Sequence, residues 1–145
     1  MPDTLTHALS LLPHGPEFRF VDRLLQLEPG RQGTGEYTVH EDLELLRGHF
    51  PGHPLFPGVL LIEAAAQLAG IVAQSDPHLN PLPGLKLTGL RNIKILGSAR
   101  PGATIQIQAR ISGRLGSLIQ AEAVVSLEGQ VLLQGALALS GESPT

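Results

Sequence analysis

Apolar and polar residues alternate along the carboxyl-terminal part of the chain, as they do in strands that bury one face. Three runs share this alternation: Thr104–Ile111, Leu118–Leu127 and Val131–Leu139. Residues 112–117 and 128–130, which contain glycine and polar side chains, separate the runs and fit the turns of an antiparallel meander.

The amino-terminal half predicts further elements. A short amphipathic helix is expected before Pro13, with Asp3 or Thr4 as its N-cap. Three more segments have the composition of strands: Phe18–Leu27, Glu36–His40 and Leu85–Leu96. The proline-rich segment Pro77–Gly84 is expected to be a linker between a helix and the last of these strands.

The segment Gly58–Gln74 has a different pattern, because its apolar residues occupy every face of a helix. Its alanine and leucine content favours one long helix, and a helix that is apolar all round must be covered on all sides. We therefore predict an α+β fold in which a curved antiparallel sheet of five or six strands wraps one central helix. The sequence shows no internal repeat, and residues 1–145 are expected to form a single domain.

Composition narrows the possible classes of function. The chain has 145 residues, 42% of them hydrophobic, and it has no cysteine for disulfides, thiolate nucleophiles or metal ligands. A formal net charge of -3, scattered cations and 3% aromatic residues argue against nucleic-acid binding. The amino terminus lacks the basic and apolar regions of a signal peptide, so we expect a cytoplasmic protein.

Two polar side chains, Glu63 and Gln67, interrupt the apolar helix, and their spacing of four residues places them on one face. A carboxylate among apolar residues is costly unless it is paired, hydrogen-bonded, neutralised or beside a cavity. The helix alone favours two interpretations equally. Either Glu63 takes part in catalysis, or it makes a fixed hydrogen bond to loop backbone and does nothing more.

A histidine, His49, precedes this carboxylate in a loop that is rich in proline and glycine between positions 51 and 58. Such a loop excludes a regular helix or central strand. It holds an imidazole rigidly, as a catalytic histidine requires, although a surface imidazole is the alternative. Four other histidines are assigned to structural or surface positions: His7, His14, His40 and His78.

Other chemistries have less support. His49 and His53 could form a metal pair, but Pro51 and Gly52 exclude a shared helix face, and no third ligand lies at a recognisable spacing. The sequence lacks the Gly-x-Ser-x-Gly elbow of serine hydrolases. It also lacks a phosphate-binding loop and a Rossmann fingerprint. We therefore expect no metal site.

Residues 48–67 read GHFPGHPLFPGVLLIEAAAQ and resemble, over twenty positions without a gap, the signature of FabZ-type 3-hydroxyacyl-[acyl-carrier-protein] dehydratases. Residues 12–14 and 20–23 also resemble the amino-terminal segment of this family. The resemblance implies the hot-dog fold, in which a sheet wraps a helix. Residues 15–18 and 100–103 differ from the usual family pattern, which leaves room for a relative that serves a polyketide or polyene pathway.

The resemblance implies a role for each of four residues. His49 would remove the C2 proton of the substrate, and Glu63 would protonate or orient the departing 3-hydroxyl to give a trans-2-enoyl thioester. Gly58 would offer its backbone N–H to the thioester carbonyl, a role that the free N–H groups of a helix start favour independently. Gln67 would orient Glu63, or make a simple packing or loop hydrogen bond. This elimination transfers no electrons, and no cofactor is expected.

Partners are implied as well. Acyl carrier protein would carry the substrate and, being acidic, would dock on basic residues such as Arg91, Lys94 and Arg100. Enzymes of this kind form dimers or trimers of dimers, in which His49 and Glu63 of one site come from different subunits. Small residues in the helix would permit close contact between subunits or burial within one: Ala64, Ala65, Ala66, Ala69 and Gly70. The alternatives are a hot-dog thioesterase, an enoyl isomerase side activity and a catalytically idle acyl-binding subunit.

Overall fold

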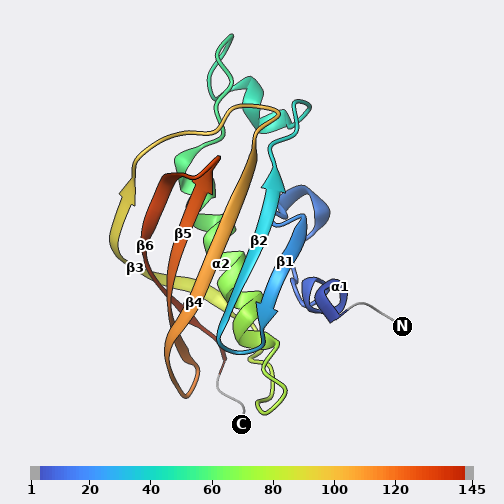
Figure 1. The fold of residues 1–145 in the computed structure, drawn as a ribbon, viewed down its shortest axis with the longest axis vertical. Coiled ribbons are helices and arrows are strands. Elements are labelled where there is room, and N and C mark those ends of the chain that lie inside the picture. Colours follow the sequence, from blue (N-terminus) through green and yellow to red (C-terminus); the bar gives the residue numbers. More distant parts are fainter. Residues whose placement is uncertain (1–3, 143–145) are drawn as a thin grey trace.

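The computed structural model describes residues 4–142, which form a six-stranded antiparallel sheet curved around one long helix (Figure 1). The elements follow in this order: α1 (Thr4–Leu9), η1 (Pro16–Phe18), β1 (Arg23–Glu28), β2 (Gln32–Thr38), η2 (Glu44–Arg47), α2 (Gly58–Gln74), β3 (Lys86–Ile95), β4 (Thr104–Leu115), β5 (Leu118–Leu127) and β6 (Gln130–Ser140). This is the α+β hot-dog architecture that the sequence predicts. Within residues 4–142, every helix falls short of the length and apolarity that crossing a membrane demands.

The strands lie in the order β1-β2-β4-β5-β6-β3, and every neighbouring pair is antiparallel. The chain leaves β2, passes through α2, crosses to β3 at the far edge and returns through β4 to the middle of the sheet. Figure 1 shows α2 running behind the central strands, where it packs on β2, β4, β5 and β6. The strands β1 and β3 form the two edges.

Alternation along the central strands produces the face that covers α2. In β4, Ile105 and Ile107 are completely buried, whereas Gln106 and Gln108 between them are exposed. Helix α2 supplies the opposing surface with residues that include Leu68, which is also completely buried. The resulting core is aliphatic at its centre, and α2 has the bounds that its composition predicts.

Helix α2 and the sheet approach each other closely at β2, where Gly33 has no side chain. A Cβ at Gly33 would stand 2.9 Å from Cγ2 of Val72, a distance that real contacts do not reach. This glycine explains an error in the sequence interpretation. The second strand runs over Gln32–Thr38 rather than Glu36–His40, because inward-facing glycines at 33 and 35 hide the apolar alternation.

Two other predicted boundaries are also wrong. The first strand begins at Arg23 and not at Phe18, because backbone groups of Phe18 and Phe20 bind a helix side chain instead of a neighbouring strand. The turn expected over residues 112–117 is shorter, since β4 continues to Leu115 and pairs there with the start of β5. The N-cap expected at Asp3 or Thr4 falls on side chains outside the described part of the chain.

Candidate active site

An apolar pocket of about 800 Å³ opens beside α2, between the helix, the segment that follows α1 and the start of β3. One face of α2 forms its floor, with positions that recur every three or four residues: Glu63, Ala66, Gln67, Gly70, Ile71 and Gln74. Leucines from the two flanking segments form the walls: Leu11, Leu12, Leu82, Leu85, Leu87 and Leu139. The pocket therefore has one ionisable group on its floor, the carboxylate of Glu63.

Glu63 is partly exposed, and its side chain keeps 23% of its accessible surface. One carboxylate oxygen, Oε2, accepts a hydrogen bond of 3.0 Å from Nε2 of Gln67 and lies 3.4 Å from Nε2 of His14. The carboxylate thus has two polar neighbours and borders a cavity, which are two of the conditions that make a carboxylate tolerable in an apolar helix. The neighbouring alanines Ala64 and Ala65 are completely buried.

Gln67 holds the surroundings of Glu63 in place. Its Oε1 accepts a hydrogen bond of 2.8 Å from the backbone N–H of Phe20, while Nε2 donates to the carbonyl of Phe18 at 2.9 Å. Because a backbone N–H can only donate, these contacts fix which end of the amide faces Glu63. The side chain is 2% exposed. Gln67 therefore ties the carboxylate to a segment nearly fifty residues away in the sequence.

His14, which was expected at a structural or surface position, is a neighbour of Glu63 in the fold. It lies in the segment between α1 and η1, stacks on Phe18 with ring centroids 6.1 Å apart, and directs Nε2 at Glu63. Its Nδ1 is buried and has no hydrogen-bond partner within residues 4–142. With its proton on Nε2, His14 can donate toward the carboxylate. The family resemblance covers positions 14 and 63 separately, but only the fold brings their side chains together.

His49 lies in a loop that is fixed by its own backbone. The carbonyl of His49 accepts a hydrogen bond from the N–H of Leu55 at 2.8 Å, and Nδ1 of His49 lies 2.9 Å from the carbonyl of Leu55. Phe50 and His53 exchange two further backbone hydrogen bonds across a turn at Gly52. Since a carbonyl only accepts, Nδ1 carries a proton, and this contact leaves Nε2 as the nitrogen available to other partners.

Helix α2 begins at Gly58, directly after this loop. Among the described side chains, none caps its N-terminus, so the first N–H groups face outward without a side-chain acceptor. A Cβ at Gly58 would stand 3.2 Å from Cδ1 of Ile95, so glycine permits the close approach of the end of β3. The helix start thus lies between the His49 loop and the β3 edge.

The single chain does not join His49 to Glu63. Within residues 4–142 no hydrogen bond or ion pair connects the two side chains, and His49 is not among the residues that line the apolar pocket.

The small residues of α2 divide between the core and the pocket. Ala64, Ala65 and Ala69 are completely buried against their own protomer, whereas Gly70 opens onto the pocket.

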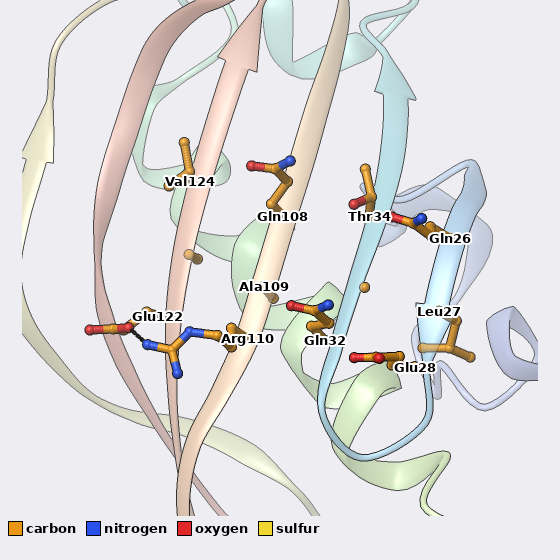
Figure 2. A pocket seen from close by; sticks show the side chains of 12 residues that line it. Gln26, Leu27, Glu28, Gln32, Thr34, Gln108, Ala109, Arg110, Glu122 and Val124 are labelled. Carbon is orange, nitrogen blue, oxygen red and sulfur yellow. Dashed lines mark hydrogen bonds and ion pairs between the residues drawn. The ribbon is translucent and has the colours of Figure 1, made fainter.

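A second hollow, of about 600 Å³, lies on the outer face of the sheet over β1, β2, β4 and β5. Figure 2 shows that amide and hydroxyl side chains, such as those of Gln26, Thr34 and Gln108, project from this face. Arg110 and Glu122 form an ion pair directly across neighbouring strands. These are the polar positions of the alternating strands, and neither His49 nor Glu63 lines the hollow.

Metal ligands are not clustered in the described part of the chain. Within residues 4–142, no cluster of three or more His, Asp or Glu side chains is placed to hold a metal ion.

Tyr37, which is 2% exposed, packs against Phe20 and Phe56 in the core. Burial, followed by the negative charge of Asp22, raises the pKa of Tyr37 to about 12. The phenol therefore stays neutral at physiological pH.

Comparison with known proteins places these residues among relatives. The sequence pattern of the FabA-like domain matches residues 12–136. A 3-hydroxyacyl-[acyl-carrier-protein] dehydratase FabZ from Roseiflexus castenholzii is 33% identical over 129 residues, which cover 89% of this chain and 90% of the relative. The FabZ of Chloroflexus aggregans is 30% identical over 143 residues, or 98% of each chain.

Solved structures with low sequence identity share the fold. The dehydratase heterocomplex ApeI:P from Xenorhabdus doucetiae superposes with a TM-score of 0.76 at 20% identity, covering 91% of this chain and 88% of that one. Zebra fish thioesterase superfamily member 2 gives a TM-score of 0.63 at 17% identity, covering 83% and 80%. Dehydratases and thioesterases thus share this architecture, and the fold alone does not separate the two activities.

Proposed function

Because this chain belongs to the FabA-like domain family, we propose that it dehydrates 3-hydroxyacyl thioesters, carried by acyl carrier protein, to trans-2-enoyl thioesters in fatty acid biosynthesis or a related pathway. The observation that carries this proposal is the position of Glu63. Its carboxylate is held by Gln67 and His14 at the floor of a large apolar pocket beside α2. The pocket suits an aliphatic chain, and the carboxylate suits the hydroxyl that leaves.

His49 is the proposed base. Its Nδ1 proton points at the Leu55 carbonyl, so the lone pair of Nε2 is free to accept a proton. The thioester makes the C2 proton of the substrate acidic, and Nε2 removes it. Phe50 stacks on the ring with centroids 3.9 Å apart and, with the carbonyl, limits its rotation. A base that is oriented in this way needs no movement during the reaction.

Glu63 is the proposed acid. It donates a proton to the 3-hydroxyl, the C3–O bond breaks, and water leaves as the electrons of the C2–H bond form the double bond. One proton reaches His49 and one leaves Glu63, so the reaction balances without electron transfer. Gly58 would stabilise negative charge on the thioester oxygen through its backbone N–H at the start of α2.

The proposed site needs a second copy of the chain, because one protomer does not join His49 to Glu63. The edge strand β3 pairs with β6 on one side and with no strand on the other within residues 4–142. Apolar side chains on and beside this edge are about half exposed or more: Val59, Leu90, Ile95 and Leu96. A homodimer through β3 would cover them and bring the His49 loop of one protomer towards the other.

Mixing two inactive variants tests this arrangement. When His49→Ala and Glu63→Gln subunits are mixed after unfolding, sites built across subunits regain one intact copy per mixed dimer, about a quarter of wild-type activity by random pairing. Sites built within a protomer would regain none. Size-exclusion chromatography with light scattering would establish whether the assembly is a dimer or a hexamer.

Carrier-protein docking is proposed at exposed basic residues near the β3 edge. Arg91 and Lys94 lie on β3, Arg100 follows it, and all three are exposed. Acyl carrier protein is acidic, so reversing the charge of Arg100, which lies outside the proposed dimer edge, should raise KM for carrier-protein substrates and leave kcat unchanged. A pantetheine thioester of the same acyl group, which lacks the protein, is the control and should show no change in KM.

The activity itself is tested with 3-hydroxybutyryl and crotonyl carrier-protein thioesters. Interconversion of the two confirms a dehydratase. Release of free thiol without hydration or dehydration would instead identify a thioesterase, in which the carboxylate directs water at the thioester carbonyl. Product analysis would also reveal an isomerase side activity, in which the 2-enoyl thioester loses a proton from C4 and gains one at C2 to give a 3-enoyl thioester.

A further inference from the structure

The apolar pocket follows α2 from Glu63 towards the end of the helix at Gln74. Between Leu61 and Ala73 every helix residue is buried except two, Glu63 and Gly70. These two lie seven residues apart, which is about two helical turns, or roughly 10 Å along the axis. They therefore open on the same face of α2, one as the proposed acid and the other as a gap in the surface.

The fold does not require glycine at position 70. Its backbone does not adopt a positive φ, and a Cβ there would stand 3.7 Å from Cδ2 of Leu85, an ordinary contact. By contrast, a Cβ at Gly33 would collide with Val72. Glycine within a helix costs about 1 kcal/mol relative to alanine. At position 70 glycine leaves a stretch of the pocket floor without a side chain, beside the Leu85 wall.

We propose that Gly70 sets the length of acyl chain that this enzyme accepts, an inference that rests on the proposed dehydratase function. A substrate whose 3-hydroxyl lies at Glu63 would extend its alkyl chain along α2 past Ala66 and across Gly70. An extended chain advances roughly 1.2 Å per bond, as a peptide does over the three bonds of each residue. About nine bonds beyond C3 therefore reach Gly70, which corresponds to an acyl group of roughly twelve carbons.

Two hydrogen bonds join Gln74 and Leu82 at the far end of the pocket. Gln74 donates to the carbonyl of Leu82 at 2.7 Å and accepts from the N–H of Leu82 at 2.9 Å. This pair fixes the linker against the last turn of α2. The walls between the two ends are leucines, and Lys86, which is exposed, is the one lysine or arginine among the described lining residues. The occupant that fits such a space is an uncharged aliphatic chain.

Substitutions of increasing size at position 70 test the proposal. Gly70→Ala and Gly70→Leu are compared with wild type on 3-hydroxyacyl carrier-protein thioesters of four and fourteen carbons. We expect Gly70→Leu to keep kcat/KM for the four-carbon substrate within about twofold and to lower it for the fourteen-carbon substrate by about tenfold or more. Gly70→Ala, which fits without a clash, should fall between wild type and Gly70→Leu.

A rescue variant distinguishes a blocked pocket from a disrupted fold. In the Gly70→Leu background, Leu85→Ala removes the opposite wall and should restore turnover of the long substrate. Equal loss of kcat/KM at both chain lengths, with or without a changed oligomeric state, would overturn the role of Gly70. Such a result would indicate that the face of α2 around Gly70 packs against another subunit. If wild-type protein dehydrates neither substrate, the proposed function itself fails, and the two failures are thereby distinct.

Discussion

The two parts of the proposed site are held in opposite ways. The His49 loop is closed by contacts within seven residues, from His49 to Leu55, and most of these contacts are between backbone atoms. Glu63 is held by side chains, and the groups that fix it come from Gln67 on its own helix and from His14, Phe18 and Phe20 far away in the sequence. One half of the site is built locally, and the other depends on tertiary structure.

The two regions meet in an aromatic cluster. Phe20, whose N–H is bound by Gln67, packs edge-on against Phe56 with ring centroids 5.6 Å apart, and Tyr37 contacts both rings. Phe56 ends the His49 loop and pairs its N–H with the carbonyl of Ala99. The cluster therefore joins the locally built half of the site to the half that depends on tertiary contacts.

The largest effect is expected when either member of the proposed catalytic pair, His49 or Glu63, is removed. His49→Ala and Glu63→Gln should each lower kcat for dehydration by about a hundredfold to ten-thousandfold, because each removes a proton-transfer group. Circular dichroism should show that both variants remain folded. His53→Ala is the matched control in the same loop. Its side chain is exposed and its structural hydrogen bonds come from the backbone, so kcat should stay within about twofold of wild type.

Gln67→Leu should damage stability and catalysis together. It leaves the N–H of Phe20 and the carbonyl of Phe18 without their partner, which should lower the free energy of unfolding by about 3 kcal/mol in urea denaturation. It also frees Glu63, so kcat should fall. Gln74→Leu is the control, since it removes two similar hydrogen bonds to Leu82 but none to Glu63. A loss of kcat as large in that control would contradict the comparison.

Raising the pH tests the aromatic cluster. The pKa of Tyr37 is about 12 in the folded protein, whereas that of an unfolded chain is near 10. Below about pH 10 both states keep the proton. Between about pH 10 and 12 only the unfolded state ionises, so stability should fall by up to about 3 kcal/mol as the pH rises.

The measurement compares wild type with Tyr37→Phe, which lacks this titration, in denaturation at several pH values. Tyr37 is the single tyrosine and the chain has no tryptophan, so ultraviolet absorbance reports its ionisation directly. An absorbance midpoint near pH 10 in folded protein would show that the cluster is open to water.

The smallest effect is expected at His14. His14→Leu removes the donor beside Glu63 and should lower kcat by about tenfold, with little change in KM. His14→Gln, which can still place an N–H near the carboxylate, should recover most of that loss. If the two variants are equally impaired, His14 contributes packing against Phe18 and does not position Glu63.

The sequence predicts well the features that depend on local composition. The bounds of α2 follow from its alanine and leucine content, and the alternation of β5 marks that strand from Leu118 to Leu127. The loop before α2 could likewise be predicted, because proline and glycine restrict the backbone whatever surrounds them. In this loop His49 and Leu55 are joined by two hydrogen bonds, one between their backbones and one from the His49 ring to the Leu55 carbonyl. Both are local consequences of the restricted backbone.

Other features depend on contacts that no short pattern records. The late start of β1 follows from the use of Phe18 and Phe20 backbone groups by Gln67. The early start of β2 was hidden because Gly33, which faces Val72 of α2, and Gly35 stand at inward positions without a side chain. His14 belongs to a segment that resembles the family, but the interaction that defines its place in the site is with a carboxylate 49 positions later, by the numbering of His14 and Glu63. The hydrophobic periodicities of strands and helices, two and 3.6 residues, carry no information on contacts between residues that are far apart in the sequence.

The hydrogen bonds of Gln67 span 47 and 49 positions, whereas the side-chain bond of His49 spans six. Closing a long loop costs more chain entropy than closing a short one, and contacts of high sequence separation slow folding. During refolding, His49 can therefore reach its geometry as soon as its own loop closes, while the surroundings of Glu63 must wait for the amino-terminal segment to dock. Local opening of that segment would release the carboxylate before the sheet unfolds. Catalytic competence would then be the last property gained on folding and the first lost.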